Sequence, residues 1–109
     1  MSELNKVINE LLEFRDIRDW KQFHNPKDLS LALSIEASEL LEQFLWKNAE
    51  DANKDKIKYE LADIFAYALL LANHYELDLP SIIREKMEIN NQKYPVEKAK
   101  GIAKKYTDL

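Results

Sequence analysis

Two pairs of carboxylic acids repeat one spacing in this chain, and these residues are the best placed to do chemistry. Glu36 is followed three residues later by Glu39, and Glu60 is followed three residues later by Asp63. On a helix, this spacing places both side chains of a pair on one face, about 60° apart and about 4.5 Å along the axis. Carboxylates gathered in this way can hold a divalent cation or activate water.

Two of these acids lie among apolar residues. Asp63 interrupts a run from Leu61 to Ala72 in which all the remaining residues are apolar or Tyr. Glu36 has apolar neighbours at helical spacing, namely Ala32, Leu33 and Leu40. A buried carboxylate without a partner is costly or takes up a proton. We therefore expect a positive charge beside the four acids.

A divalent cation is the simplest source of that charge. The chain has no Cys, and neither His24 nor His74 follows an acid by three residues, so thiolate zinc sites and Glu-x-x-His di-iron sites are excluded. Ligation by oxygen alone favours Mg²⁺, with Mn²⁺ as a substitute. The alternative interpretation is that the acids are solvated, which we adopt for four others: Glu42, Glu50, Asp51 and Glu85.

The composition predicts that helices position these acids. The chain has 109 residues, the size of one domain with one hydrophobic core over residues 1–109, and it holds 1 Gly and 3 Pro. Tight β-hairpins and glycine-rich phosphate loops need more Gly, and Gly101 alone can form neither. We predict an all-α fold, a four-helix bundle completed by oligomerisation.

Apolar spacing and capping residues predict where the helices lie. The first begins after Ser2 and fades near Arg18, and Asn25 or Asp28 caps the second. The remaining expected ranges are 27–47 for the second helix, 54–75 for the third and 80–94 for the fourth, with an irregular basic arm over 96–109. Because the third helix is apolar around its whole circumference, we expect a second subunit to cover it.

Charge and hydropathy narrow the classes of partner. A net charge of -4 argues against a nucleic-acid partner held through its phosphates. The apolar run is too short to cross a bilayer, which takes about 20 residues, and the first residues lack the pattern of a signal peptide. We expect a soluble cytoplasmic protein with neither a nucleic-acid nor a membrane partner.

Longer motifs around the acids resemble one family. The stretch Ile35–Glu42 followed by Glu60–Ile64 is similar to the E-x-x-E and E-x-x-D signature of the MazG-like nucleotide pyrophosphohydrolases. Five further blocks resemble the dCTP pyrophosphatase branch of that family: Arg18–His24, Phe44–Lys47, Lys86–Asn90, Lys93–Pro95 and Lys104–Thr107. The chain departs from the pattern at Ile35, where many members carry an acid, and at Leu11, where some carry His.

This resemblance implies an enzyme that assembles as a dimer or as a tetramer of two dimers. Such enzymes hydrolyse (deoxy)nucleoside triphosphates to the monophosphate and pyrophosphate with Mg²⁺, and the branch implies a dCTP-like substrate and a house-cleaning role in the nucleotide pool. The metal ligands implied by position are the four paired acids: Glu36, Glu39, Glu60 and Asp63. We hypothesise that Glu39 also orients the attacking water.

A nucleotide substrate also needs a flat apolar slot and cations. The candidates to stack on the base or complete the slot are Trp20, Phe23, His24 and Trp46. Tyr67, one turn beyond Asp63, is a candidate to reach the sugar or a phosphate, although Tyr67 or Trp46 could equally be core residues. The candidates for phosphate contacts share one face of the fourth helix: Lys86, Asn90 and Lys93.

Two other functions remain open at this point. One is a helical oligomerisation module whose acids pair with Lys or Arg across a subunit interface. Against it, no Lys or Arg occurs between Ser30 and Leu45 or between Glu60 and Tyr75. The other is a nucleotide sensor that keeps the metal site and has lost turnover, and nothing in the sequence argues against it.

Overall fold

The computed structural model describes residues 1–109 and is helical, without a β-strand, which confirms the predicted all-α fold. The α-helices are α1 (Glu3–Asp16), α2 (Pro26–Glu42), α3 (Lys54–His74), α4 (Leu79–Lys93) and α5 (Val96–Ala99). Three short 3-10 helices are η1 (Lys21–Phe23), η2 (Ala49–Asp51) and η3 (Tyr106–Asp108). The chain forms two compact units, Met1–Glu76 and Leu77–Leu109, each described by itself below. No helix has the length and apolar character of a membrane span.

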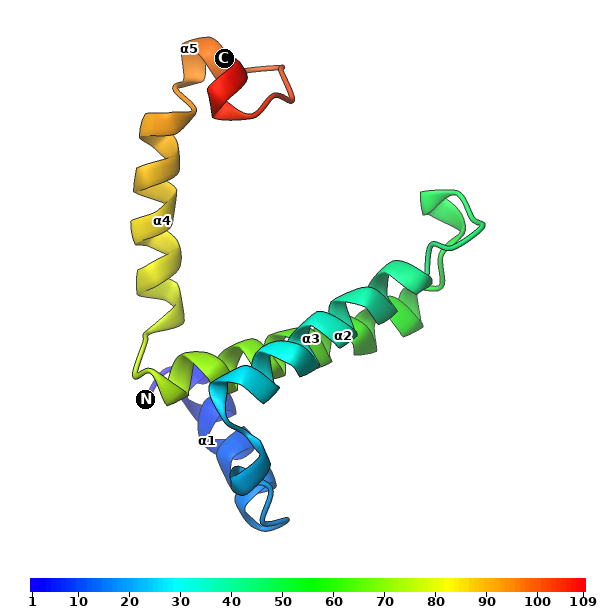
Figure 1. Cartoon of the computed structure of the whole chain (residues 1–109), viewed down its shortest axis with the longest axis vertical. Coiled ribbons are helices and arrows are strands. Elements are labelled where there is room, and N and C mark those ends of the chain that lie inside the picture. The colour runs from blue at the N-terminus through cyan, green and yellow to red at the C-terminus, as the bar shows by residue number, and fades with distance from the viewer. The chain divides into compact units, whose positions relative to one another are not determined.

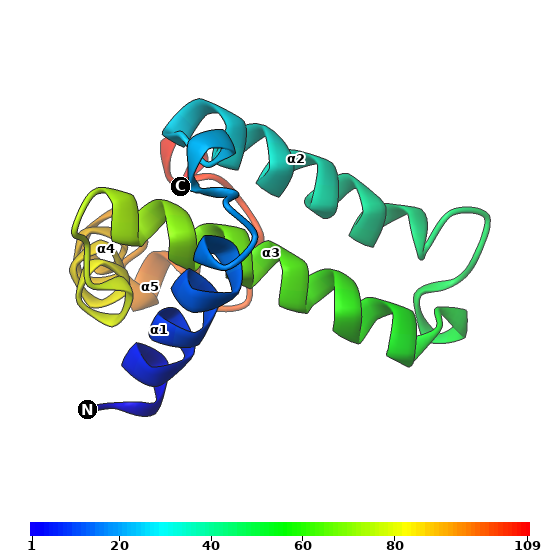
Figure 2. The ribbon, with the colours of Figure 1, turned by 90° about the horizontal axis from the view of Figure 1, so that it is seen from below.

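The first unit is a helical hairpin crossed by a third helix. In this unit α2 and α3 run antiparallel and side by side, and α1 packs against α3 (Figures 1 and 2). The buried core joins the start of α2 to the second half of α3, and its residues are Leu29, Leu69, Leu70 and Ala72. The paired acids lie farther along the hairpin, where α2 and α3 still face each other but their side chains are more exposed than in the core.

The apolar circumference of α3 is only partly covered within one chain. Leu69, Leu70 and Ala72 are buried, whereas Leu61 is 40% exposed and Phe65 is 56% exposed. The sequence predicts that a 109-residue chain cannot cover this helix on every side, and the exposed half of α3 agrees with that argument. Covering by a second subunit stays a prediction.

Capping side chains decide where the helices of this unit begin. Ser2 Oγ accepts a hydrogen bond from a first-turn N–H of α1 at 3.2 Å, and Asn25 Oδ1 accepts one from α2 at 2.9 Å. Asn53 Oδ1 accepts two at the start of α3, at 3.0 and 3.2 Å. The predicted caps Ser2 and Asn25 are confirmed, because these oxygens satisfy N–H groups that have no partner inside the helix.

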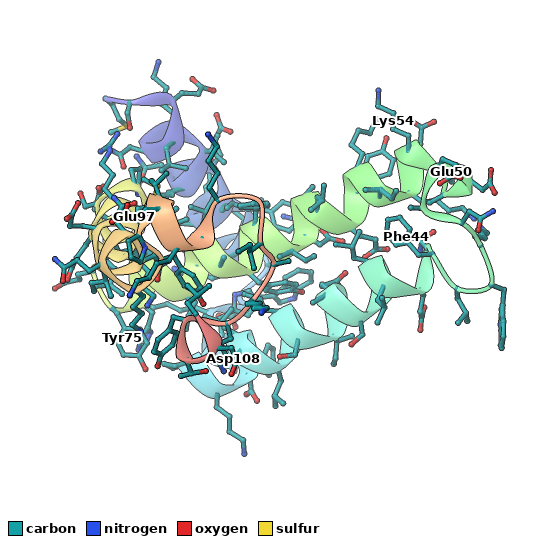
Figure 3. The ribbon with its side chains drawn as sticks, turned by 90° about the horizontal axis from the view of Figure 1, so that it is seen from above. Phe44, Glu50, Lys54, Tyr75, Glu97 and Asp108 are labelled. Carbon is teal, nitrogen blue, oxygen red and sulfur yellow. The ribbon has the colours of Figure 1, made fainter.

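The end of α2 differs from the prediction, since the helix stops at Glu42 and does not reach Lys47. The N–H groups of Gln43, Phe44 and Leu45 each bond to the carbonyl three residues earlier, which tightens the chain out of α-helical geometry. Trp46 then takes a left-handed conformation with φ 62°, which terminates the turn. Figure 3 labels Phe44 and Glu50 in the connection and Lys54 at the start of α3.

In the second unit, the expectation of an irregular arm over 96–109 is wrong. This segment forms the short helices α5 and η3, joined through Gly101, whose φ of 76° is a left-handed conformation that suits Gly. The chain reverses direction at Gly101. The centroid of the Tyr106 ring then lies 6.0 Å from the centroid of the Tyr94 ring and 4.7 Å from Lys93 Nζ. Packing between these side chains gives the arm a local structure that hydropathy alone did not predict.

The cap of α3 gives a testable contribution to stability. We expect Asn53→Ala to lower the free energy of unfolding by about 1 kcal/mol, because two N–H groups lose their acceptor. Urea unfolding followed by circular dichroism measures the difference. Asn48→Ala is the matched control, because Asn48 precedes η2 without a side-chain capping bond. Equal losses in both variants would show that the cap contributes nothing specific.

Candidate functional site

Three carboxylates from two helices converge in the first unit. Glu36 comes from α2, and Glu60 and Asp63 come from successive turns of α3. One oxygen from each of the three lies within 4.8 Å of the others. Glu39 lies one turn farther along α2 and is outside this group of three. The antiparallel packing of α2 on α3 thus unites the two acid pairs, with three of the four acids in direct convergence.

The cluster holds no protein cation. Both salt bridges of the chain lie elsewhere, between Arg15 and Asp16 and between Lys58 and Asp55. Within the cluster, Glu36 Oε2 and Glu60 Oε2 are buried and have no hydrogen-bond partner. Unsatisfied buried oxygens of this kind destabilise a fold unless something binds to them. Their all-oxygen donor set fits a hard divalent cation such as Mg²⁺ or Mn²⁺.

The environment of the cluster shifts the pKa of Glu36. Burial, as the largest cause, together with the neighbouring carboxyl groups of Glu39, Glu60 and Asp63, raises the pKa of Glu36 from its ordinary 4.5 to about 7. The proton is retained because a charged Glu36 would be desolvated and surrounded by like charges. A bound divalent cation would reverse this preference, since it favours the ionised carboxylate.

The three members of the cluster differ in their exposure within one chain. The sequence argument depends on Asp63 being buried inside its apolar run, but Asp63 is exposed in the single chain. Glu36 and Glu60 are the half-buried members. The reason is that the half of α3 around Asp63 faces the open part of the hairpin, whereas the apolar burial is concentrated at Leu69, Leu70 and Ala72.

The raised pKa of Glu36 predicts how metal-free stability depends on pH. The folded state holds this proton more tightly than the unfolded state, so the free energy of unfolding falls as pH rises from 4.5 through about 7. We expect Glu36→Gln to reduce this fall and to weaken the stabilisation by Mg²⁺ at pH 8. Thermal melting in EDTA and in Mg²⁺ at pH 5 and 8 measures both effects.

The matched control for this prediction is Glu42→Gln, which removes an exposed acid from the same helix. It should keep the wild-type dependence on pH and on Mg²⁺. If Glu36→Gln and wild type showed the same melting temperatures in all four conditions, Glu36 would have neither the proton nor the cation assigned to it.

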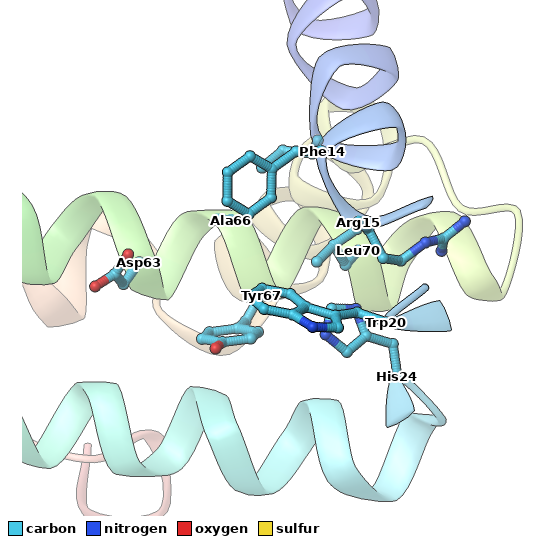
Figure 4. Close-up of a pocket in the computed structure, with 9 residues that line it drawn as sticks. Phe14, Arg15, Trp20, His24, Asp63, Ala66, Tyr67 and Leu70 are labelled. Atoms are coloured by element: carbon cyan, nitrogen blue, oxygen red, sulfur yellow. The ribbon is translucent and has the colours of Figure 1, made fainter. Parts of the chain in front are cut away.

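A pocket begins at the cluster and follows α3 toward the core. It has a volume of about 290 Å³, and Asp63 lies at one end of it (Figure 4). Its lining residues are Leu11, Phe14, Arg15, Trp20, His24, Asp63, Ala66, Tyr67 and Leu70. Figure 4 shows the Tyr67, Trp20 and His24 rings close together between α2 and α3, with Phe14 on the side of α1. Asp63 therefore belongs both to the carboxylate cluster and to an aromatic pocket.

Two polar groups in the pocket are suited to hydrogen bonding with a neutral ligand. His24 Nδ1 is buried without a partner, and burial, together with the charge of Arg15, lowers the pKa of His24. Burial also raises the pKa of Tyr67, with the charges of Glu36, Asp63 and Glu39 acting in the same direction. Near neutral pH the imidazole is therefore uncharged and the phenol keeps its proton.

The structure gathers some of the predicted substrate residues and separates others. Trp20, His24 and Tyr67 line the pocket. Phe23 and Trp46 do not line it, and they are 61% and 94% exposed. The three predicted phosphate contacts, Lys86, Asn90 and Lys93, lie on α4 in the second unit.

Several pocket residues were not identified from the sequence. Phe14, Arg15, Ala66 and Leu70 complete the lining. A signal was present, because Leu11, Phe14 and Arg15 are spaced by three and four residues and so share one face of α1. That face carries apolar residues in any helix that packs on a core, so spacing alone could not distinguish a pocket wall from core.

Comparison with known protein families shows the class of the protein. Residues 31–109 match the MazG-like family, which is well over half of the chain. The protein therefore belongs to the MazG-like family, and the resemblance seen in its acid motifs is confirmed.

Individual relatives agree with this assignment. The chain is 41% identical over 105 residues to dCTP pyrophosphatase 1 of Mus musculus and 38% identical to that of Homo sapiens, covering 89% of this chain and 62% of each relative. It is also similar to the crystal structure of a pyrophosphatase from Archaeoglobus fulgidus DSM 4304, with a TM-score of 0.82 and 35% identity over 87% of this chain and 94% of that chain. The chain thus spans less than two thirds of the length of the mammalian relatives.

Proposed function

We propose that this protein hydrolyses (deoxy)nucleoside triphosphates to the monophosphate and pyrophosphate, with a dCTP-like deoxynucleotide as substrate. One observation carries the proposal: Asp63 belongs to a carboxylate cluster and at the same time ends an aromatic pocket. A nucleotide has the same two-part chemistry, with an anionic chain at one end and a flat base at the other. The names of the relatives, dCTP pyrophosphatase 1 and a pyrophosphatase, support this reading.

The phosphates require positive charge at the cluster. Glu36, Glu60 and Asp63 would hold Mg²⁺, with Mn²⁺ as a substitute, and Glu39 would contribute from the adjacent turn. A divalent cation bound there would neutralise phosphate and carboxylate charge and increase the acidity of water. This explains how a protein of net charge -4 can bind a substrate that is itself strongly anionic.

Glu39 is the proposed general base. Glu39 interacts with Glu36 but lies outside the converging group of three, so we assign the proton transfer to Glu39 and not to those three acids. In the proposed step, Glu39 accepts a proton from water as the water oxygen forms a bond to phosphorus. The phosphoanhydride bond between the α- and β-phosphates breaks, and pyrophosphate leaves with the bonding electrons.

The pocket residues bind and orient the rest of the substrate. Trp20 would stack on the base, a contact worth about 1–3 kcal/mol in proteins that bind single-stranded nucleic acids. The uncharged imidazole of His24 would hydrogen-bond to the base, and the Tyr67 hydroxyl would bond to the sugar or a phosphate.

We also propose that the protein acts as a homo-oligomer, a tetramer of two dimers. The exposed apolar side chains of Leu61 and Phe65 on α3 support association. Trp46 and Phe23 remain proposed substrate contacts, and since they lie outside the pocket of their own chain they would act at the pocket of a neighbouring copy. Lys86, Asn90 and Lys93 remain proposed phosphate contacts. Native mass spectrometry tests the assembly, and a monomer at micromolar concentration would contradict it.

The experiment that tests the function is pyrophosphate release from a panel of dNTPs and NTPs, in Mg²⁺ and in EDTA. We expect release in Mg²⁺ and none in EDTA, fastest with dCTP or a related pyrimidine deoxynucleotide, which is the activity of a nucleotide-pool house-cleaning enzyme. Melting of the protein with the same nucleotides distinguishes the alternatives. Nucleotide-dependent stabilisation without turnover would indicate a sensor, and no effect of nucleotide or metal would indicate a structural module.

A further inference from the structure

The segment that carries Trp20 reverses direction directly after α1. Asp19 has a φ of 55°, a left-handed conformation that is uncommon for a residue other than Gly. Two hydrogen bonds hold the reversal, from Trp20 N–H to the Arg15 carbonyl at 3.1 Å and from Gln22 Nε2 to the Asp19 carbonyl at 2.9 Å. The chain therefore returns along α1 and places the Trp20 ring beside its last turns.

Trp20 and Phe14 meet there as two walls of the pocket. Their ring centroids are 6.0 Å apart with the planes at 72°, an edge-to-face arrangement. Both rings line the pocket, yet Phe14 is 50% exposed and Trp20 is 43% exposed. Core packing alone therefore does not determine how these rings are oriented.

The guanidinium of Arg18 lies near both rings. Its guanidinium carbon lies 3.6 Å from the Phe14 ring centroid and 5.8 Å from the Trp20 ring centroid. Its Nη1 donates a hydrogen bond of 2.9 Å to the Phe14 carbonyl. Arg18 has no carboxylate partner, unlike Arg15, which pairs with Asp16 at 2.8 Å. Two aromatic faces and one carbonyl are the partners of this charge.

We propose that Arg18 is a positioning residue for the nucleobase: its guanidinium lies over the Phe14 ring and within cation–π distance of the Trp20 ring, and so sets the angle of the aromatic wall on which the base stacks. Arg18 is not among the residues lining the pocket, so it acts through the rings and makes no contact with the substrate. This inference rests on the proposed function, because it assumes that the pocket binds a base. We call the contact of Arg18 with the Phe14 and Trp20 rings the Arg18 clamp. A cation–π contact strengthens when water is excluded, so binding of the base and the Arg18 clamp stabilise each other.

Kinetics test the consequence for the substrate. We expect Arg18→Gln to raise KM for the preferred nucleotide about two- to fivefold, the effect of losing an exposed cation–π contact, with kcat unchanged. Arg18→Lys keeps the cation and should keep most of the affinity. Lys21→Gln is the matched control, since it removes a neighbouring cation that touches neither ring. A fall in kcat at constant KM in Arg18→Gln would overturn the proposal, because it would indicate a role in the chemistry.

Fluorescence tests the Arg18 clamp without any substrate. Failure of the proposal about Arg18 is therefore distinguishable from failure of the proposed function. The chain has 2 Trp, and in a Trp46→Phe background Trp20 alone reports. In this background, we expect Arg18→Gln to shift the Trp20 emission to longer wavelength and to lower its anisotropy. Arg18→Lys should give an emission close to that of Trp46→Phe alone, and Lys21→Gln should leave it unchanged. Unchanged Trp20 emission in Arg18→Gln would overturn the proposal, and so would a changed emission combined with an unchanged KM.

Discussion

Replacing Glu60 with Gln is expected to reduce nucleotide hydrolysis by at least about a hundredfold while leaving the helical fold intact. The amide has the same shape but cannot supply the negative charge of one of the three converging carboxylates. Changes that disturb only the partners of metal ligands cost about 10–100-fold, so loss of a ligand itself should cost more. Steady-state pyrophosphate release measures the effect, and far-ultraviolet circular dichroism verifies the fold.

The control for Glu60 is an acid of the same type outside the cluster. Glu42→Gln removes an exposed carboxylate at the end of α2 and should retain wild-type turnover. In addition, Glu60→Gln should melt with little response to Mg²⁺, since its Oε2 is one of the two buried oxygens without a partner. Turnover at the wild-type rate in Glu60→Gln would show that the cluster is not the reaction centre.

Glu39→Gln is expected to lose turnover by about 10²–10⁴-fold, the usual contribution of a general base, while retaining most of the stabilisation by Mg²⁺, because the three converging carboxylates remain. The separation follows from geometry, because Glu39 adjoins the cluster but is not one of the three carboxylates whose oxygens converge. Melting temperature in Mg²⁺ and pyrophosphate release are measured on the same preparation. Glu60→Gln is the comparison, since it should lose both responses.

Two results would contradict the role given to Glu39. Full activity in Glu39→Gln would mean that another group takes the proton from water. Loss of the Mg²⁺ response together with activity would mean that Glu39 is a metal ligand above all, as the resemblance implies. The second result would change the assignment of Glu39 without changing the place of the reaction.

The helices of the first unit were predictable because their signals are local. Ser2, Asn25 and Asn53 each satisfy an N–H group in the turn that follows, and such a bond depends on a few adjacent residues. The end of α2 was not predictable in the same way. Its apolar spacing continues to Phe44, yet the N–H groups from Gln43 onward bond three residues back, and Trp46 adopts a left-handed conformation.

The site was predictable in its acids and less so in its walls. A three-residue spacing on two helices specifies which acids share a face, and packing of α2 on α3 then brings Glu36, Glu60 and Asp63 together. Which acid is buried depends on the surrounding packing, and within one chain that packing covers Glu36 and Glu60 more than Asp63. Phe14 and Arg18 act through contacts between α1 and the reversal at Asp19, a geometry that no spacing rule contains.

The measurement that tests the central claim most directly is the identity of the products formed from dCTP and Mg²⁺. Anion-exchange chromatography of one reaction separates the mono-, di- and triphosphates, and pyrophosphate and orthophosphate are quantified in parallel. The account predicts dCMP and pyrophosphate in equal amounts, formed with the wild type and not with Glu60→Gln. Formation of dCDP and orthophosphate, or no product in the presence of Mg²⁺, would contradict it.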